Sequence, residues 1–169
     1  EQVSYKYQPL FSYALKSFLD EASDLTQIDA SFDKLATTED EFLDQLAQRE
    51  RGDLPTFQKQ AATHIVYKEV RYHHILENLL AQDSSVTLIG LVRSPMAALS
   101  SWLSAPREFR KDLGWDIDAE WRHAPSKNEQ RPEEFYGFEK WKEAARLFHH
   151  LAKKHPDRVM VIAYGELLA

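Results

Sequence analysis

The chain has 169 residues, of which 43% are hydrophobic and 28% are charged, a composition typical of a folded domain rather than a disordered segment. It contains no cysteine, which excludes disulfides, zinc thiolates and a cysteine nucleophile. The formal net charge of −6 argues against a nucleic-acid-binding protein, although a local basic pocket can still hold an anionic ligand.

Neither a membrane span nor a signal peptide is visible in the sequence. No apolar run approaches the roughly 20 residues that a spanning helix needs, and the lack of cysteine fits a reducing compartment, so we expect a cytoplasmic protein. We interpret residues 1–169 as a single domain truncated at both ends, because the chain starts without Met at Glu1 and stops just after a predicted core strand.

Helices are predicted in the first part of the chain. A helix over residues 9–22 is indicated by the first-turn proline Pro9 and by the helical spacing of Phe11, Leu15, Phe18 and Leu19. Residues 24–62 are polar and are interpreted as a helical insert or lid. A capping-box pattern from Thr38 to Glu41 predicts a helix inside this insert, with a stop near Gly52.

The middle of the chain alternates strand and helix. The β-branched and aromatic residues 63–70 predict a strand, and the apolar spacing of residues 71–82 predicts a helix. Residues 85–92 (SVTLIGLV) form an almost uninterrupted apolar run, as expected for a parallel strand covered on both faces. Ser94 and Pro95 then supply the N-cap and the first-turn proline of another helix.

The last third of the chain combines an irregular segment with a helix and a strand. Residues 105–131 contain two prolines, Pro106 and Pro125, and many charged and aromatic residues, which favours a long loop excursion. Pro132 is expected to open a helix, and residues 159–164 are the last predicted strand. The alternation of strands and helices predicts an α/β fold with a parallel sheet.

Large aromatic side chains gather around the excursion: Trp102, Trp115, Trp121, Tyr136 and Phe138. They suit stacking on an adenine, a sugar face or a lipid chain. The alternative is that Trp102 and Phe138 are core residues and that the others anchor an irregular loop.

A permanent cation, Arg93, stands between the apolar run and the helix that Ser94 caps. Ligands of open parallel sheets bind at the carboxyl ends of the strands, where a helix N-terminus offers free amide donors. A guanidinium can hold two phosphate oxygens there at once. From these residues alone, a phosphate site and an arginine paired with a surface carboxylate are equally plausible.

The motif Arg93-x-Pro95, with Ser101 eight residues after the arginine, resembles the 3′-phosphate-binding motif of sulfotransferases. The resemblance implies that Arg93 and Ser101 hold the 3′-phosphate of the sulfate donor, 3′-phosphoadenosine 5′-phosphosulfate (PAPS), without a metal. It also implies a P-loop-like, three-layer fold with helices on both sides of the sheet. Residues 7–11 (YQPLF) resemble a YEPLW-like segment of the carbohydrate-type and bacterial branch, and residues 158–168 look like its later strand.

The family's 5′-phosphosulfate loop has no counterpart here, since no G-x-x-x-x-G-K-[ST]-like stretch occurs in the sequence. The resemblance places this loop before Glu1, so catalysis is expected only if the intact protein supplies it. With that condition, the resemblance implies transfer of a sulfuryl group to a hydroxyl or amine of a carbohydrate, lipid or other small molecule. An inactive nucleotide-binding module, or another phosphate-loop transferase such as a small-molecule kinase, is the alternative.

Transfer to a hydroxyl needs a general base, which the sequence does not decide. The resemblance puts a glutamate near the YEPLW-like segment, but this chain has Gln8, whose amide cannot take the proton, so Gln8 is a candidate substrate contact only. Glu69 is the best substitute, with a solvated carboxylate as the alternative. Lys68 matches the lysine of a Lys-Thr-His segment in cytosolic sulfotransferases, which implies a contact with the donor. The histidine of that segment is replaced by Val70, so its role as the base does not carry over.

Overall fold

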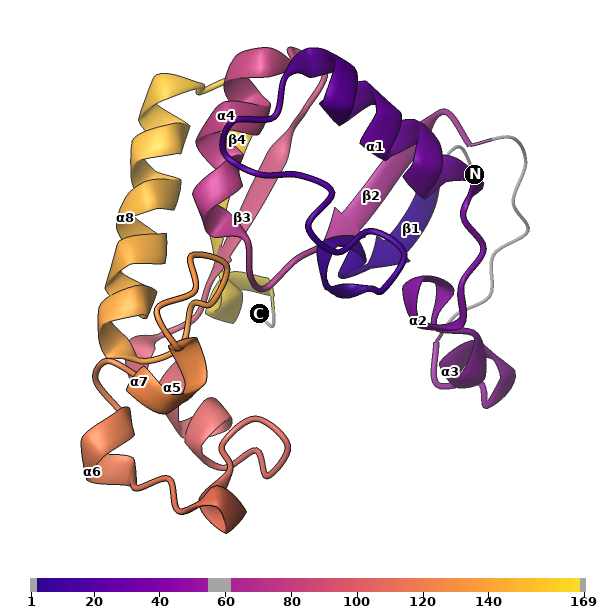
Figure 1. Cartoon of the computed structure of the whole chain (residues 1–169). Coiled ribbons are helices and arrows are strands. Elements are labelled where there is room, and N and C mark those ends of the chain that lie inside the picture. The colour runs from indigo at the N-terminus through magenta and orange to yellow at the C-terminus, as the bar shows by residue number, and fades with distance from the viewer. Residues whose placement is uncertain (1–2, 55–61, 168–169) are drawn as a thin grey trace. The chain divides into compact units, whose positions relative to one another are not determined.

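The computed structural model describes residues 3–54 and 62–167 and divides into two compact units, residues 1–83 (unit 1) and residues 84–169 (unit 2) (Figure 1). Each unit contains one pair of parallel strands accompanied by helices. The predicted α/β class and the parallel pairing are therefore confirmed. Within the described residues the strands form two separate two-stranded sheets, and the single domain over 1–169 stays a prediction.

Unit 1 is built on β1 (Val3–Tyr7) and β2 (His64–Lys68), paired so that Tyr7 lies opposite Lys68. The strand predicted at 63–70 is confirmed. The helical elements of this unit are the 3-10 helix η1 (Pro9–Phe11), α1 (Leu25–Thr37), α2 (Glu41–Asp44), α3 (Leu46–Glu50), the 3-10 helix η2 (His73–Ile75) and α4 (Leu76–Gln82).

The helix predicted over residues 9–22 is wrong, because this segment contains only η1 and a series of turns. The N–H of Leu10 donates to the Glu69 carboxylate at 2.8 Å, and Ser17 has a left-handed φ of 58° that an α-helix cannot contain. Leu15 and Leu19 are nevertheless buried. The spacing of these apolar residues therefore marks the side chains that are buried. The same spacing suits a helix and a series of turns, so it does not distinguish the two.

The capping box lies at the start of α1 and not at Thr38, where it was predicted. The Asp24 side chain accepts the N–H of Gln27 at 2.9 Å, and the Gln27 side chain accepts the N–H of Asp24 at 3.0 Å. Thr38 instead ends α1, and Asp40 caps α2. The stop expected near Gly52 is confirmed, since α3 ends two residues earlier. Residues 55–61 of the predicted insert lie outside the described residues.

Unit 2 is built on β3 (Leu88–Val92) and β4 (Val159–Ala163), paired so that Val92 lies opposite Ala163. The strands predicted at 85–92 and 159–164 and the helix after Ser94 are confirmed. The helical elements of this unit are α5 (Pro95–Leu103), the 3-10 helix η3 (Lys111–Leu113), α6 (Ile117–Glu120), α7 (Pro125–Asn128), α8 (Phe138–Lys154) and the 3-10 helix η4 (Tyr164–Leu167).

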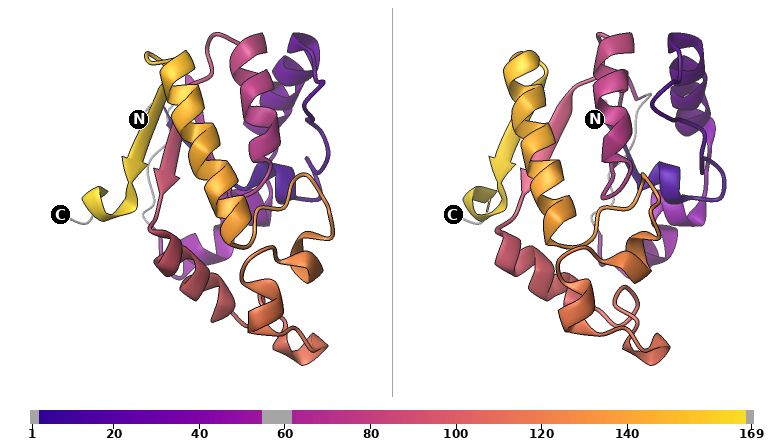
Figure 2. Two further views of the ribbon diagram at one scale, coloured as in Figure 1. Left: turned by 90° about the vertical axis from the view of Figure 1, so that its left-hand side faces the viewer. Right: turned by 60° about the vertical axis from the view of Figure 1, so that its left-hand side comes forward.

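Helix α8 covers one face of the β3–β4 sheet (Figure 2). It begins at Phe138 and not at Pro132 as predicted, because Gly137 has a φ of 88° and ends the preceding turn. At Gly90, in the middle of β3, α8 approaches closely: a Cβ atom there would lie 3.0 Å from the ring of Phe148. Glycine at residue 90 is therefore what allows this helix to pack against the sheet.

The opposite face of the same sheet carries exposed apolar side chains. Ile89 and Leu91 of β3 are 59% and 52% exposed, and Met160 of β4 is 58% exposed. Ile89 and Met160 are direct partners in the ladder, so they share this face. The expectation that residues 85–92 are covered on both faces is therefore wrong for the part of the chain that the structure describes.

The segment between α5 and α8 packs against α5 around a core in which Trp102, Phe109 and Ala124 are buried. The side chain of Asn128 donates to the carbonyls of His123 and Tyr136, both at 2.9 Å, and accepts the N–H of Tyr136 at 3.0 Å. Trp102 is thus a core residue. Among the described helices, none is both long enough and apolar enough to cross a bilayer.

Gly90→Ala is expected to lower the free energy of unfolding by about 1–3 kcal/mol, because the new methyl group presses against the Phe148 ring. Urea denaturation measures this loss. Gly165→Ala is the matched control, since nothing lies within 4 Å of a Cβ atom at that position, and it should change the free energy by less than about 0.5 kcal/mol. Equal losses in the two variants would contradict the close packing of β3 on α8.

Candidate functional site

The strand-to-helix junction of unit 2 has the local structure that its sequence predicts. Arg93 directly follows β3, and Ser94 caps α5 by accepting the N–H of Ala97 at 3.3 Å. Pro95 is the first residue of α5, where its missing N–H costs nothing. The amide donors of the first turn of α5 therefore lie next to the guanidinium-bearing residue.

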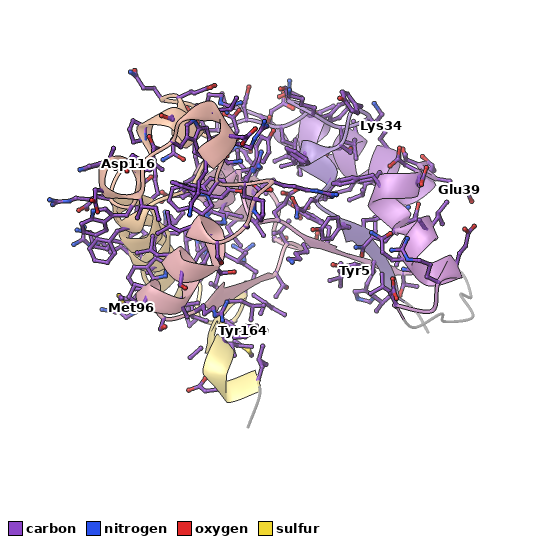
Figure 3. All side chains as sticks on the ribbon, turned by 90° about the horizontal axis from the view of Figure 1, so that it is seen from below. Tyr5, Lys34, Glu39, Met96, Asp116 and Tyr164 are labelled. Atoms are coloured by element: carbon purple, nitrogen blue, oxygen red, sulfur yellow. The ribbon has the colours of Figure 1, made fainter. Side chains whose placement is uncertain are left out.

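Arg93 makes two contacts with other residues of unit 2. The indole Nε1 of Trp141, on α8, donates to the backbone carbonyl of Arg93 at 3.0 Å. The guanidinium carbon of Arg93 lies 5.5 Å from the centroid of the Tyr164 ring. Tyr164, labelled in Figure 3, directly follows β4. Because Val92 pairs with Ala163, the next residues on the two strands are Arg93 and Tyr164.

The side chain of Arg93 is exposed, and within the described residues of unit 2 no carboxylate pairs with it. Other arginines of this unit are held by acids: Arg110 bonds Asp112 at 2.8 Å, and Arg122 bonds Glu139 at 3.0 Å. The interpretation of Arg93 as half of a surface ion pair therefore receives no support from these residues. Its N–H donors are available to an external anion.

Ser101 is an exposed residue near the end of α5. Two other serines of this helix bond its own backbone, since Ser94 caps it and Ser104 donates to the carbonyl of Ser100 at 2.7 Å. Eight residues of helix span about 12 Å along the axis. Among the described residues no hydrogen bond joins Arg93 to Ser101. An anion that contacts both residues would therefore require the long arginine side chain to extend along the helix.

A second pair of strand ends lies in unit 1. Because Tyr7 pairs with Lys68, the residues that follow on β1 and β2 are Gln8 and Glu69. The N–H of Gln8 donates to the carbonyl of Lys68 at 2.8 Å, and Gln8 adopts a left-handed φ of 42°. Strained backbone of this kind is concentrated at functional sites and tight turns. Lys68 is exposed, with its ammonium 5.5 Å from the Tyr7 ring centroid.

The Glu69 carboxyl group is held away from water. Burial raises its pKa to about 7, against the opposing effects of the Leu10 N–H and of Arg71. Its Oε1 accepts the Leu10 N–H at 2.8 Å, whereas Oε2 is buried and, among the described residues, has no hydrogen-bond partner. A carboxyl group with this pKa exchanges a proton near neutral pH, which is the property of a general base.

His73, four residues after Glu69, shows the opposite shift. Burial lowers the pKa of His73 to about 4, and the neighbouring His74 adds to this effect. In unit 1, the Glu69 carboxyl group thus stays protonated to a higher pH than usual, and the His73 imidazole stays neutral to a lower pH than usual. No three His, Asp or Glu side chains in the described parts of the chain are arranged to hold a metal ion.

The structure brings the candidate residues together in two sets. Lys68, Glu69 and Gln8 lie in unit 1, whereas Arg93 and Ser101 lie in unit 2. Sequence reasoning missed Tyr164 and Trp141, which contact Arg93. The position of Tyr164 directly after an apolar strand was the available signal, because parallel strands end at the same edge of a sheet.

Comparison with known proteins assigns the chain to no family. No family model matches it, no curated protein matches it and no solved structure matches it. The function is therefore inferred from the residues and their geometry.

Glu69→Gln is expected to change how stability depends on pH. Stability from the raised pKa of Glu69 is complete below pH 4.5 and lost as the pH rises through about 7. Stability from the lowered pKa of His73 is complete above pH 6.5 and lost as the pH falls through about 4. The two effects oppose each other in the wild-type protein.

In Glu69→Gln only the His73 effect remains, so the free energy of unfolding should rise between pH 4.5 and 6.5. The slope can reach about 1.4 kcal/mol per pH unit for one full proton. Urea denaturation at several pH values measures it, and Glu39→Gln, at an exposed residue of the same unit, is the control. A variant profile identical to that of the wild-type protein would contradict the burial of Glu69.

Proposed function

We propose that the chain is part of a PAPS-dependent sulfotransferase and that unit 2 binds the 3′-phosphate of the donor nucleotide. The observation that carries this proposal is the exposed Arg93, unpaired with any carboxylate of the described part of unit 2, at the end of a parallel strand and ahead of a capped helix. A phosphate there would meet a planar guanidinium and the partial positive charge of a helix N-terminus. Ser101 is the second proposed contact.

The P-loop-like, three-layer fold belongs to the same proposal. It is supported by two parallel strand pairs, since parallel strands occur almost only in sheets with helices on both faces. The exposed Ile89 and Leu91 are the apolar side chains that such a second layer would cover.

The proposed reaction is an in-line displacement at sulfur. The acceptor oxygen forms a bond to sulfur while the bond from sulfur to the phosphate oxygen breaks, and adenosine 3′,5′-bisphosphate leaves. Glu69 would take the proton of the acceptor hydroxyl, for which its buried carboxyl group with a pKa of about 7 is suited. Lys68 would stabilise charge on the donor, and Gln8 would contact the acceptor, which is a carbohydrate, lipid or other small molecule.

A catalytically inactive nucleotide-binding module is the second candidate. It is favoured by Gln8, because an amide stands where the resemblance implies a catalytic glutamate. Binding of the donor nucleotide without any transfer of sulfate would distinguish this candidate from the enzyme.

Arg93→Ala is expected to weaken the binding of adenosine 3′,5′-bisphosphate by about 5- to 150-fold, the loss of a charge-assisted hydrogen-bond pair. Calorimetric titration measures this affinity beside that of adenosine 5′-monophosphate, which lacks the 3′-phosphate. Arg107→Ala, at another exposed arginine of unit 2, is the matched control and should bind like the wild-type protein. A wild-type protein that does not prefer the 3′-phosphorylated ligand would overturn the proposed function.

Glu69→Gln is expected to lower turnover by roughly 10²- to 10⁴-fold in a preparation that transfers sulfate, because the amide cannot accept the proton. Nucleotide affinity should stay unchanged. Steady-state sulfate transfer and the titration above measure the two quantities, with Glu39→Gln as the control. Wild-type turnover in Glu69→Gln would remove Glu69 from the mechanism and leave the donor site untouched.

A further inference from the structure

We infer that Tyr164 is a positioning residue for the donor site: its ring holds the Arg93 guanidinium in the orientation that receives the 3′-phosphate. The inference rests on the proposed function, in which Arg93 binds that phosphate. In this role Tyr164 does not contact the reacting atoms. Its effect is transmitted through the guanidinium, whose carbon lies 5.5 Å from the centroid of the ring.

The register of β3 and β4 makes this contact possible. Ile89 pairs with Met160 and Leu91 with Ile162, so these side chains share the sheet face opposite to α8. Arg93 and Tyr164 directly follow these strands, and the 5.5 Å between the guanidinium carbon and the ring centroid shows that their side chains meet at the carboxyl ends. The stacking therefore follows from parallel pairing in this register, and a shift by one residue would separate the two side chains.

The backbone of Arg93 is held independently of its side chain. Trp141 lies on α8, on the other face of the sheet, and its Nε1 donates to the Arg93 carbonyl at 3.0 Å. Tyr164 is 41% exposed, so its ring is available as a stacking surface. Its neighbour Glu166 accepts the N–H of Ala163 through Oε2 at 3.3 Å, and within the described part of unit 2 it forms no ion pair with Arg93.

Stacking suits an anion site better than an ion pair would. A cation–π contact uses no conventional hydrogen-bond acceptor, so the five N–H donors of a guanidinium stay free for phosphate oxygens. A carboxylate partner would occupy those same donors. An exposed arginine also loses much rotamer freedom when it binds a ligand, and the ring removes part of that freedom beforehand.

Tyr164→Leu and Tyr164→Phe test this role by calorimetric titration with adenosine 3′,5′-bisphosphate and with adenosine 5′-monophosphate. Loss of the ring in Tyr164→Leu should weaken the bisphosphate complex by about 2- to 5-fold, the range of an exposed cation–π contact. It should leave the monophosphate complex unchanged. Tyr164→Phe keeps the ring and should behave like the wild-type protein.

A double-mutant cycle isolates the route through Arg93. In the Arg93→Ala background, Tyr164→Leu should cause no further loss of bisphosphate affinity. Upfield ring-current shifts of the Arg93 side-chain protons, recorded by NMR without nucleotide, should be present in the wild-type protein and in Tyr164→Phe and absent in Tyr164→Leu. These shifts report the stacking even in a protein that binds no nucleotide.

The outcomes separate this inference from the proposed function. If the 3′-phosphate preference depends on Arg93 but Tyr164→Leu leaves it intact, the role of Tyr164 is wrong and the donor site stands. Equal weakening of both ligands, or a Tyr164→Phe variant as weak as Tyr164→Leu, would also overturn the positioning role. If the wild-type protein shows no 3′-phosphate preference, the proposed function fails and the role of Tyr164 at a donor site fails with it.

Discussion

Parallel strand register is the constraint on which both candidate sites depend. In a parallel pair the two strands end at the same edge, so the residues that follow them become neighbours without any further interaction. In unit 1 this brings Gln8 beside Glu69, and in unit 2 it brings Arg93 beside Tyr164. Residues that are about 60 to 70 positions apart in the sequence thereby become neighbours.

The two edges use opposite electrostatic environments. The Glu69 carboxyl group is buried, so water no longer stabilises its charge and its pKa rises to about 7. Arg93 is exposed, with an aromatic ring as its neighbour instead of an acid. The proposed general base and the proposed phosphate ligand thus differ in their burial.

The sequence predicted β2, β3 and β4, the cap at Ser94 and the position of Arg93, because each depends on a few adjacent residues, whereas β1 was not predicted. It failed where distant partners decide the structure. The N–H of Leu10 bonds Glu69, nearly 60 residues away, and the segment that follows forms turns with a left-handed Ser17 instead of the predicted helix. Likewise, the contact of Tyr164 with Arg93 depends on the pairing of β3 with β4, and the burial of Glu69 depends on the chain folding over it.

The conformation of Gln8 has a consequence for how such a protein can change. Its left-handed backbone, with φ 42° and ψ 59°, is held by the hydrogen bond from its N–H to the carbonyl of Lys68. Glutamate has the same side chain as glutamine up to Cδ, so it would meet the same backbone cost and keep the same bond. Codons for glutamine and glutamate differ by a single base. A carboxylate at residue 8 is therefore one mutational step away, and the backbone conformation at this residue places no barrier in either direction.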